Sequence, residues 1–80
     1  MQNYLTTFYN KISISDQYEC WIWNGCKNWA GYGVSRYEGG YEKAHRVMWR
    51  LQHGEIPKGM FVLHECDVPD CVSPFHLFLG

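Results

Sequence analysis

The stretch that decides the fold is "LHECDVPDCVSPFHLFLG", residues 63–80. Within it, Cys66, Cys71 and His76 follow a C-x4-C-x4-H spacing in a segment broken by two prolines. Zinc favours four tetrahedral thiolate or imidazole ligands, so this spacing predicts a local zinc-binding loop that needs one more ligand from elsewhere. The candidates for that fourth ligand are Cys20, Cys26, His53 and His64.

Cys20 is the favoured fourth ligand because it begins the aromatic segment "CWIW", a short predicted strand that would hold it rigidly. Cys26 follows a glycine in a predicted turn and is the weaker choice. The alternative is a set of buried free thiols and a hydrogen-bonded histidine. A chain of 80 residues builds a limited core, and structural zinc contributes on the order of 10 kcal/mol to folding. These points favour zinc.

The remaining sequence predicts one domain, residues 1–80, of the α+β class. Ala44, Val47, Met48 and Leu51 have the spacing of an amphipathic helix, and Gly54 suits its end. The other expected elements are a short helix over 3–12, a loop over 13–19, a strand in "CWIWNG", a hairpin turning at 38–40, a strand in "MFVLHEC" and a last apolar piece in "FHLFLG".

Composition and charge limit the function classes. The formal net charge is −1, whereas nucleic-acid-binding domains usually carry a basic excess, so long-range attraction to DNA should be weak. No segment has the length of a membrane span or the pattern of a secretory signal, so we expect a cytoplasmic protein whose cysteines bind metal rather than form disulfides. Four basic residues could form a positively charged face: Arg36, Lys43, Arg46 and Arg50. A face of mixed charge is favoured over this alternative, because Glu38 and Glu42 lie nearby in the sequence.

Five motifs in order, "CWIWNG", "GYG", "AHR", "GEIPKG" and "LHECDVPDCVSPFHLFLG", resemble the zinc-stapled HNH, or His-Me finger, endonucleases of phages and mobile introns. The resemblance runs from about Phe8 to Gly80 and implies a ββα-metal fold. It implies that His64 is the general base that activates water for attack on a phosphodiester, a role that suits imidazole near neutral pH. It also places His45 and Arg46 near the active centre.

The same resemblance assigns a structural zinc to Cys20, Cys66, Cys71 and His76. Ser73 stands where the family usually has asparagine, a mild change because serine also makes local hydrogen bonds to the backbone. In the family, a helix carrying the asparagine ligand of catalytic Mg²⁺ follows the last glycine. Since Gly80 ends the sequence, we expect a fold truncated before that final helix.

The function expected from these features is that of an HNH-endonuclease-like phage protein without nuclease activity. It would bind a protein or nucleoprotein target of the bacterial host, for example as an inhibitor of a defence system such as CRISPR-Cas. One alternative is an active, divalent-metal-dependent nicking endonuclease with His64 as base, Mg²⁺ being held by Asp67, Asp70 or a partner subunit. A simple zinc-stapled DNA-binding module is the third possibility, and it predicts binding that weakens steeply with salt.

Overall fold

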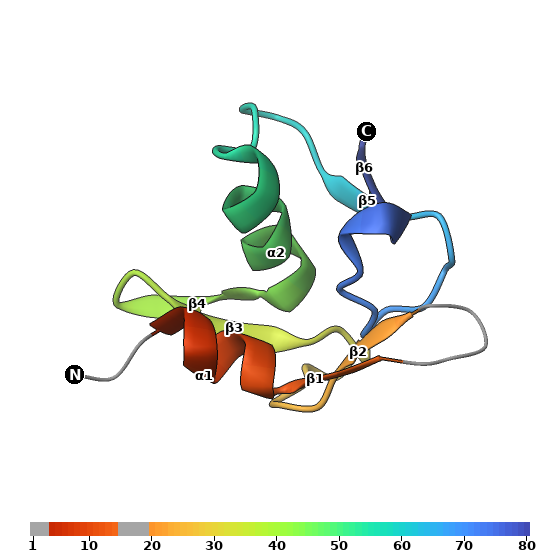
Figure 1. Ribbon diagram of the computed structural model, residues 1–80. Helices are drawn as coiled ribbons and strands as arrows, with labels where there is room; N and C mark the ends of the chain where they lie inside the picture. Colours follow the sequence, from red (N-terminus) through yellow and green to blue (C-terminus); the bar gives the residue numbers. More distant parts are fainter. Residues whose placement is uncertain (1–3, 15–19) are drawn as a thin grey trace.

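The computed structural model describes residues 4–14 and 20–80. The described part of the chain contains three two-stranded antiparallel sheets rather than one continuous sheet, and they lie below and to one side of the longer helix (Figure 1). The elements are α1 (Tyr4–Asn10), β1 (Ile12–Ile14), β2 (Trp21–Trp23), β3 (Val34–Tyr37), β4 (Gly40–Lys43), α2 (Ala44–His53), β5 (Val62–His64), η1 (Pro74–His76) and β6 (Leu77–Leu79).

The α+β class is confirmed, and the N-terminal boundaries need correction. The expected helix over 3–12 ends at Asn10, and residues 12–14 form β1, which pairs with β2 in the register Ile12↔Trp23. A strand therefore begins where the sequence suggested the end of a helix and the start of a loop. Its β-branched isoleucines pack better on a pleated surface than in a short terminal helix. The expected loop over 13–19 lies partly outside the described residues.

The predicted hairpin is confirmed, with its turn at Glu38 and Gly39. Both residues have positive φ, 45° and 81° respectively. This is the geometry of a two-residue turn whose twist matches that of the flanking strands. β3 and β4 pair in the register Val34↔Lys43, so the hairpin leads directly into the first turn of α2.

The core lies where α2 covers the sheets, as the spacing of its apolar residues predicts. Ala44, Val47 and Met48 are fully buried, and Leu51 packs at the edge of the same cluster. The chain leaves the helix at Gly54, whose φ of 90° is costly for other residues. The described helices are too short and too polar to cross a lipid bilayer.

The two apolar segments expected near the C-terminus, in "MFVLHEC" and "FHLFLG", pair as the β5–β6 hairpin. Its register is Val62↔Leu79, Leu63↔Phe78 and His64↔Leu77, and the loop between the strands carries the two cysteines. Alternation along β6 buries Leu77 and leaves Phe78 partly exposed. This hairpin places the end of β5 and the cysteine loop next to each other, between α2 and β2 (Figure 1).

Candidate functional site

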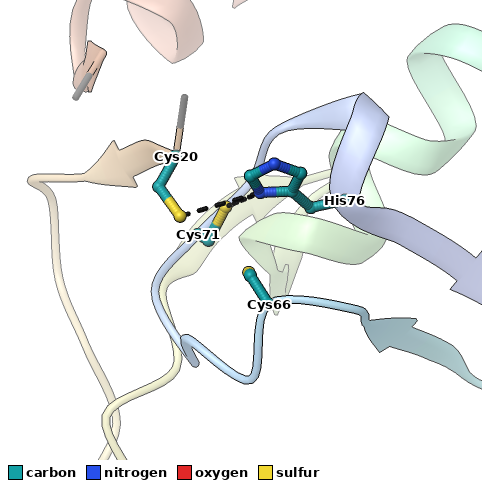
Figure 2. Close-up of side chains that lie close together, drawn as sticks. All are labelled: Cys20, Cys66, Cys71 and His76. Atoms are coloured by element: carbon teal, nitrogen blue, oxygen red, sulfur yellow. Dashed lines mark hydrogen bonds between the residues drawn. The ribbon is translucent and has the colours of Figure 1, made fainter. Parts of the chain in front are cut away.

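A cluster of three cysteines and one histidine joins the start of β2 to the cysteine loop and η1. The ligand atoms of Cys20, Cys66, Cys71 and His76 all lie within 4.8 Å of one another. Figure 2 shows that the three sulfur atoms and the His76 ring converge from the start of β2, the cysteine loop and η1. The structure thus brings together the four residues that the sequence suggested as zinc ligands, and it selects Cys20 from the candidates for the fourth position.

The spacing of these atoms fits a tetrahedral zinc ion. With Zn–S bonds of about 2.3 Å and Zn–N bonds of about 2.05 Å, a ligand sulfur and a ligand nitrogen stand about 3.6 Å apart. The His76 Nδ1 atom lies 3.6 Å from Cys20 Sγ and 3.5 Å from Cys71 Sγ. The other pairs need to contract by at most about 1 Å to reach the ~3.8 Å expected between two zinc-bound sulfurs. The cluster can hold a metal ion, and its donor set favours zinc.

The acid–base properties of the thiols couple metal binding to proton release. Burial, together with nearby thiols, raises the pKa of Cys71 to about 12 and also raises the pKa of Cys20. Without a cation these thiols are protonated at neutral pH. A zinc ion binds the thiolate form, so occupation of the site would displace protons and become weaker in acid.

The backbone around Cys71 explains why the cluster has this shape. Ile22 and Cys71 form an isolated antiparallel bridge, and Val72 N–H donates to the Trp21 carbonyl at 2.7 Å. The hydroxyl of Ser73 accepts a hydrogen bond from Phe75 N–H at 3.3 Å and so caps η1. Serine therefore supplies a capping oxygen at the position where the family usually has asparagine.

His64 ends β5 and is held by the zinc-cluster loop. Its Nε2 atom lies 2.8 Å from the carbonyl oxygen of Cys71. A carbonyl only accepts hydrogen bonds, so Nε2 carries the proton and Nδ1 is the basic nitrogen of the neutral ring. The described residues offer Nδ1 no hydrogen-bond donor. Burial lowers the pKa of His64, which keeps the ring neutral at physiological pH.

His45, in the first turn of α2, packs directly on His64. The two ring centroids are 4.6 Å apart, and His45 Nε2 donates to the Val62 carbonyl at 3.0 Å. His45 is only 4% exposed, and its Nδ1 atom has no partner among the described residues. Burial lowers the pKa of His45 to about 4, with a smaller contribution from the neighbouring His64. This residue is a neutral, buried support for the His64 ring.

A pocket of about 460 Å³ opens beside these two histidines. The ring of Tyr32 forms part of its wall, with its centroid 6.0 Å from that of His64, and the Lys43 ammonium lies 5.4 Å from the same tyrosine ring. Sequence reasoning did not single out Tyr32. The "GYG" motif was the available signal, because a tyrosine between two glycines marks a close backbone approach. The complete lining is Tyr32, Lys43, His45, Arg46, Phe61, Val62, Leu63, His64, Asp67, Pro69 and Phe78.

Charge around the pocket is mixed rather than uniformly basic. Glu42 accepts from Arg50 at 3.0 Å and pairs with Arg46 at 3.3 Å, as the favoured prediction of a mixed face expects. Asp70 is bound to Lys27 at 2.7 Å, whereas Asp67 lines the pocket. Of the two aspartates considered for a catalytic cation, Asp67 is therefore the one at the pocket.

Two of the alternative ligands lie away from the cluster. Cys26 is exposed in the loop after β2. His53 is exposed at the end of α2, where its ring packs on Trp49 with centroids 4.1 Å apart.

Comparison with known proteins places this site in a family. Residues 42–80 match the family model described as HNH endonuclease, and this range contains β5, the cysteine loop and His64. The chain is similar to two proteins of Escherichia phage T7. It is 43% identical to "Protein 2.8" over 63 residues, covering 76% of this chain and 42% of that protein, and 37% identical to "Protein 7.7" over 62 residues, covering 78% and 48%.

The chain spans less than half the length of these two relatives. No solved structure matches it. The family model, the phage relatives and the Cys3His cluster all agree with the resemblance read from the sequence motifs. Over residues 42–80, this chain is similar to the HNH endonuclease family.

Proposed function

We propose that the pocket beside His64 hydrolyses phosphodiester bonds of DNA with the help of a divalent cation. The observation that carries this proposal is the hydrogen bond from His64 Nε2 to the Cys71 carbonyl. That bond fixes the tautomer in which Nδ1 is free to accept a proton from water. It also ties the orientation of the base to the zinc cluster, since Cys71 contributes both the carbonyl and a predicted ligand sulfur.

The remaining groups at the pocket suit an anionic substrate. Lys43 and Arg46 line it, and both are cations that can contact a phosphate. Arg46 forms an ion pair with Glu42, so a bound phosphate would compete with the Glu42 carboxylate for the Arg46 guanidinium. Their positive charge would also stabilise the extra negative charge of a pentavalent phosphorus.

The described residues at the pocket supply only some of the ligands that a catalytic cation needs. Asp67 is the acidic side chain that lines the pocket. Mg²⁺ is commonly held by one or two carboxylates together with substrate phosphates, so Asp67 and a phosphodiester oxygen fit as partial ligands. When bound, such a cation supplies charge stabilisation at the leaving oxygen. His64 would take the proton from the attacking water.

Nicking of supercoiled plasmid in Mg²⁺ or Mn²⁺ tests the proposal. We expect conversion to the open-circular form, its loss on chelation, and its loss in His64→Ala. His53→Ala is the matched control, because it removes an exposed histidine outside the pocket. Nicking that persists in folded His64→Ala, or its absence in the zinc-loaded wild type, would overturn the proposal.

A second candidate function is binding without catalysis. It is favoured by the net charge of −1 and by large exposed apolar side chains such as Phe75, which is 76% exposed. Such surfaces often mark partner sites. The target would be a host protein or nucleoprotein, for example a CRISPR-Cas effector. Target-DNA cleavage by a purified effector, with and without this protein, tests the idea. Inhibition that survives in His64→Ala would support it, and undiminished cleavage at a tenfold excess would count against that target.

A further inference from the structure

One large aromatic side chain near the pocket has no role in the core. Trp29 is 99% exposed, whereas Trp23 is buried and both Trp21 and Trp49 pack against the core. Tryptophan is seldom left entirely in water by a small domain, because its apolar area is large. The Trp29 side chain therefore contributes nothing to the core and presents its apolar surface to the outside.

The loop that carries Trp29 is well ordered by its own hydrogen bonds. Asn28 N–H donates to the Tyr32 carbonyl at 2.9 Å, and Gly31 N–H donates to the Asn28 carbonyl at 3.0 Å. The Asn28 side-chain oxygen also accepts from the backbone N–H groups of Ala30 and Tyr32 at 3.0 and 3.1 Å. Trp29 thus projects from a tight turn closed on both sides. Little backbone entropy is left to lose when it meets a partner.

The base of this loop is fixed to the core through Trp23. A Cβ added to Gly25 or Gly33 would lie 2.8 Å or 2.5 Å from atoms of the Trp23 ring, so both glycines lie directly against it. The Trp23 indole N–H donates to the Cys26 carbonyl at 3.1 Å. Lys27, beside Trp29 in the loop, is bound to Asp70 in the cysteine loop.

The loop also borders the pocket beside His64. Tyr32, three residues after Trp29, forms part of the pocket wall, and so does Pro69. A Cβ on Gly31 would be in van der Waals contact with Pro69, 3.9 Å away. A nucleic-acid strand that places a phosphate in the pocket would therefore have its neighbouring nucleotides close to the loop.

We propose that Trp29 is a stacking platform for an unpaired or unstacked base of the nucleic acid bound at the His64 pocket. The proposal rests on the proposed phosphodiester function. Stacking explains how a chain with little net charge can hold a strand, because base–aromatic contacts need no charge and tolerate any sequence. Lys43 and Arg46 supply the local cations for the backbone, and Trp29 supplies the apolar contact beside them.

Binding of a fluorescein-labelled single-stranded DNA 12-mer, measured by anisotropy in a His64→Ala background, tests the role of Trp29 without turnover. We expect Trp29→Ala to weaken binding about tenfold, within the range reported for loss of one base–aromatic stack. Trp29→Phe should retain most of the affinity. Tyr41→Ala is the matched control, because Tyr41 is 75% exposed in β4 and does not line the pocket. Circular dichroism and zinc content confirm the fold of each variant.

The outcomes separate this inference from the proposed function. If the wild type nicks plasmid and Trp29→Ala binds the 12-mer as tightly as its parent, the stacking role is overturned while the nuclease stands. If the wild type neither nicks nor binds any DNA, both fail. If Trp29→Ala and Tyr41→Ala weaken binding equally, the effect is not one of stacking and the inference is overturned. A Trp29→Ala variant that loses only the inhibition of an effector nuclease would assign the side chain to a protein partner instead.

Discussion

Replacement of Gly33 by alanine should destabilise the domain by an amount that can be worked out from its contacts. A Cβ at this position would lie 2.5, 2.7 and 3.0 Å from the Cδ1, Cγ and Cβ atoms of Trp23. Carbon atoms in favourable contact are about 3.5–4.0 Å apart, so the ring or the strand must shift by about 1 Å. Trp23 is 1% exposed, and its indole N–H is held by the Cys26 carbonyl, so no free space receives it.

Overpacking of this kind costs about 1–3 kcal/mol, and loss of the buried indole hydrogen bond adds about 1–3 kcal/mol. We therefore expect Gly33→Ala to lower the free energy of unfolding by about 2–6 kcal/mol and Tm by about 4–8 °C for each kcal/mol lost. Urea denaturation in excess zinc, followed by far-UV circular dichroism, measures the change. Gly40→Ala is the control, since the nearest atom to its Cβ is 3.9 Å away. A Gly33→Ala variant within 0.5 kcal/mol of wild type, on the order of an ordinary surface substitution, would refute the packing argument.

Three further predictions concern the metal, the buried histidine and the cation. Wild-type protein should contain about one zinc per chain, measured by plasma emission spectrometry. Cys20→Ser should lower the zinc affinity and the free energy of unfolding, whereas Cys26→Ser should change neither. Full zinc retention in Cys20→Ser would contradict the ligand assignment. The pKa of His45 is about 4 in the folded state, so the unfolded state binds more protons than the folded state below about pH 6.5. The free energy of unfolding should therefore fall by about 1.4 kcal/mol per pH unit between about pH 6.5 and pH 4, or roughly 3 kcal/mol in all. Urea titrations over this range should show a shallower slope in His45→Asn, and parallel slopes would show that the histidine contributes nothing. In the plasmid assay at limiting Mg²⁺, Asp67→Asn should reduce the nicking rate at least tenfold, which corresponds to a rise of about 1.4 kcal/mol in the activation barrier. Asp70→Asn should reduce the rate much less. Equal effects of the two substitutions would exclude Asp67 as a ligand.

Much of the fold follows from local patterns in the sequence. The α2 spacing and the Glu38–Gly39 turn fix their elements because each is decided by neighbouring residues. β1 was missed because its three residues gain their strand partners only from β2, a contact that local propensity does not contain.

In the candidate site, too, some features follow from local sequence patterns and others depend on tertiary contacts. The ligand spacing in residues 66–76 indicates the metal loop directly, and the structure brings Cys20 to it from a distant strand. The "AHR" and "GYG" motifs mark His45 and Tyr32 in the sequence, but the contacts of both rings with His64 depend on how α2 and the loop after β2 meet β5. The exposure of Trp29 is also tertiary information, since an aromatic residue in a sequence is expected in the core.

The distance along the chain between the metal-cluster residues has a consequence for how this protein folds. Cys20 and His76 are 56 positions apart, and the sheets between them are pairs of strands that are marginal when isolated. Closing so long a loop costs entropy that local hairpin contacts cannot recover early. Metal capture should thus be a late step, and refolding should slow markedly when free zinc is scarce. During synthesis the Cys20 thiol, at the start of β2, would stay exposed to oxidants until His76 leaves the ribosome.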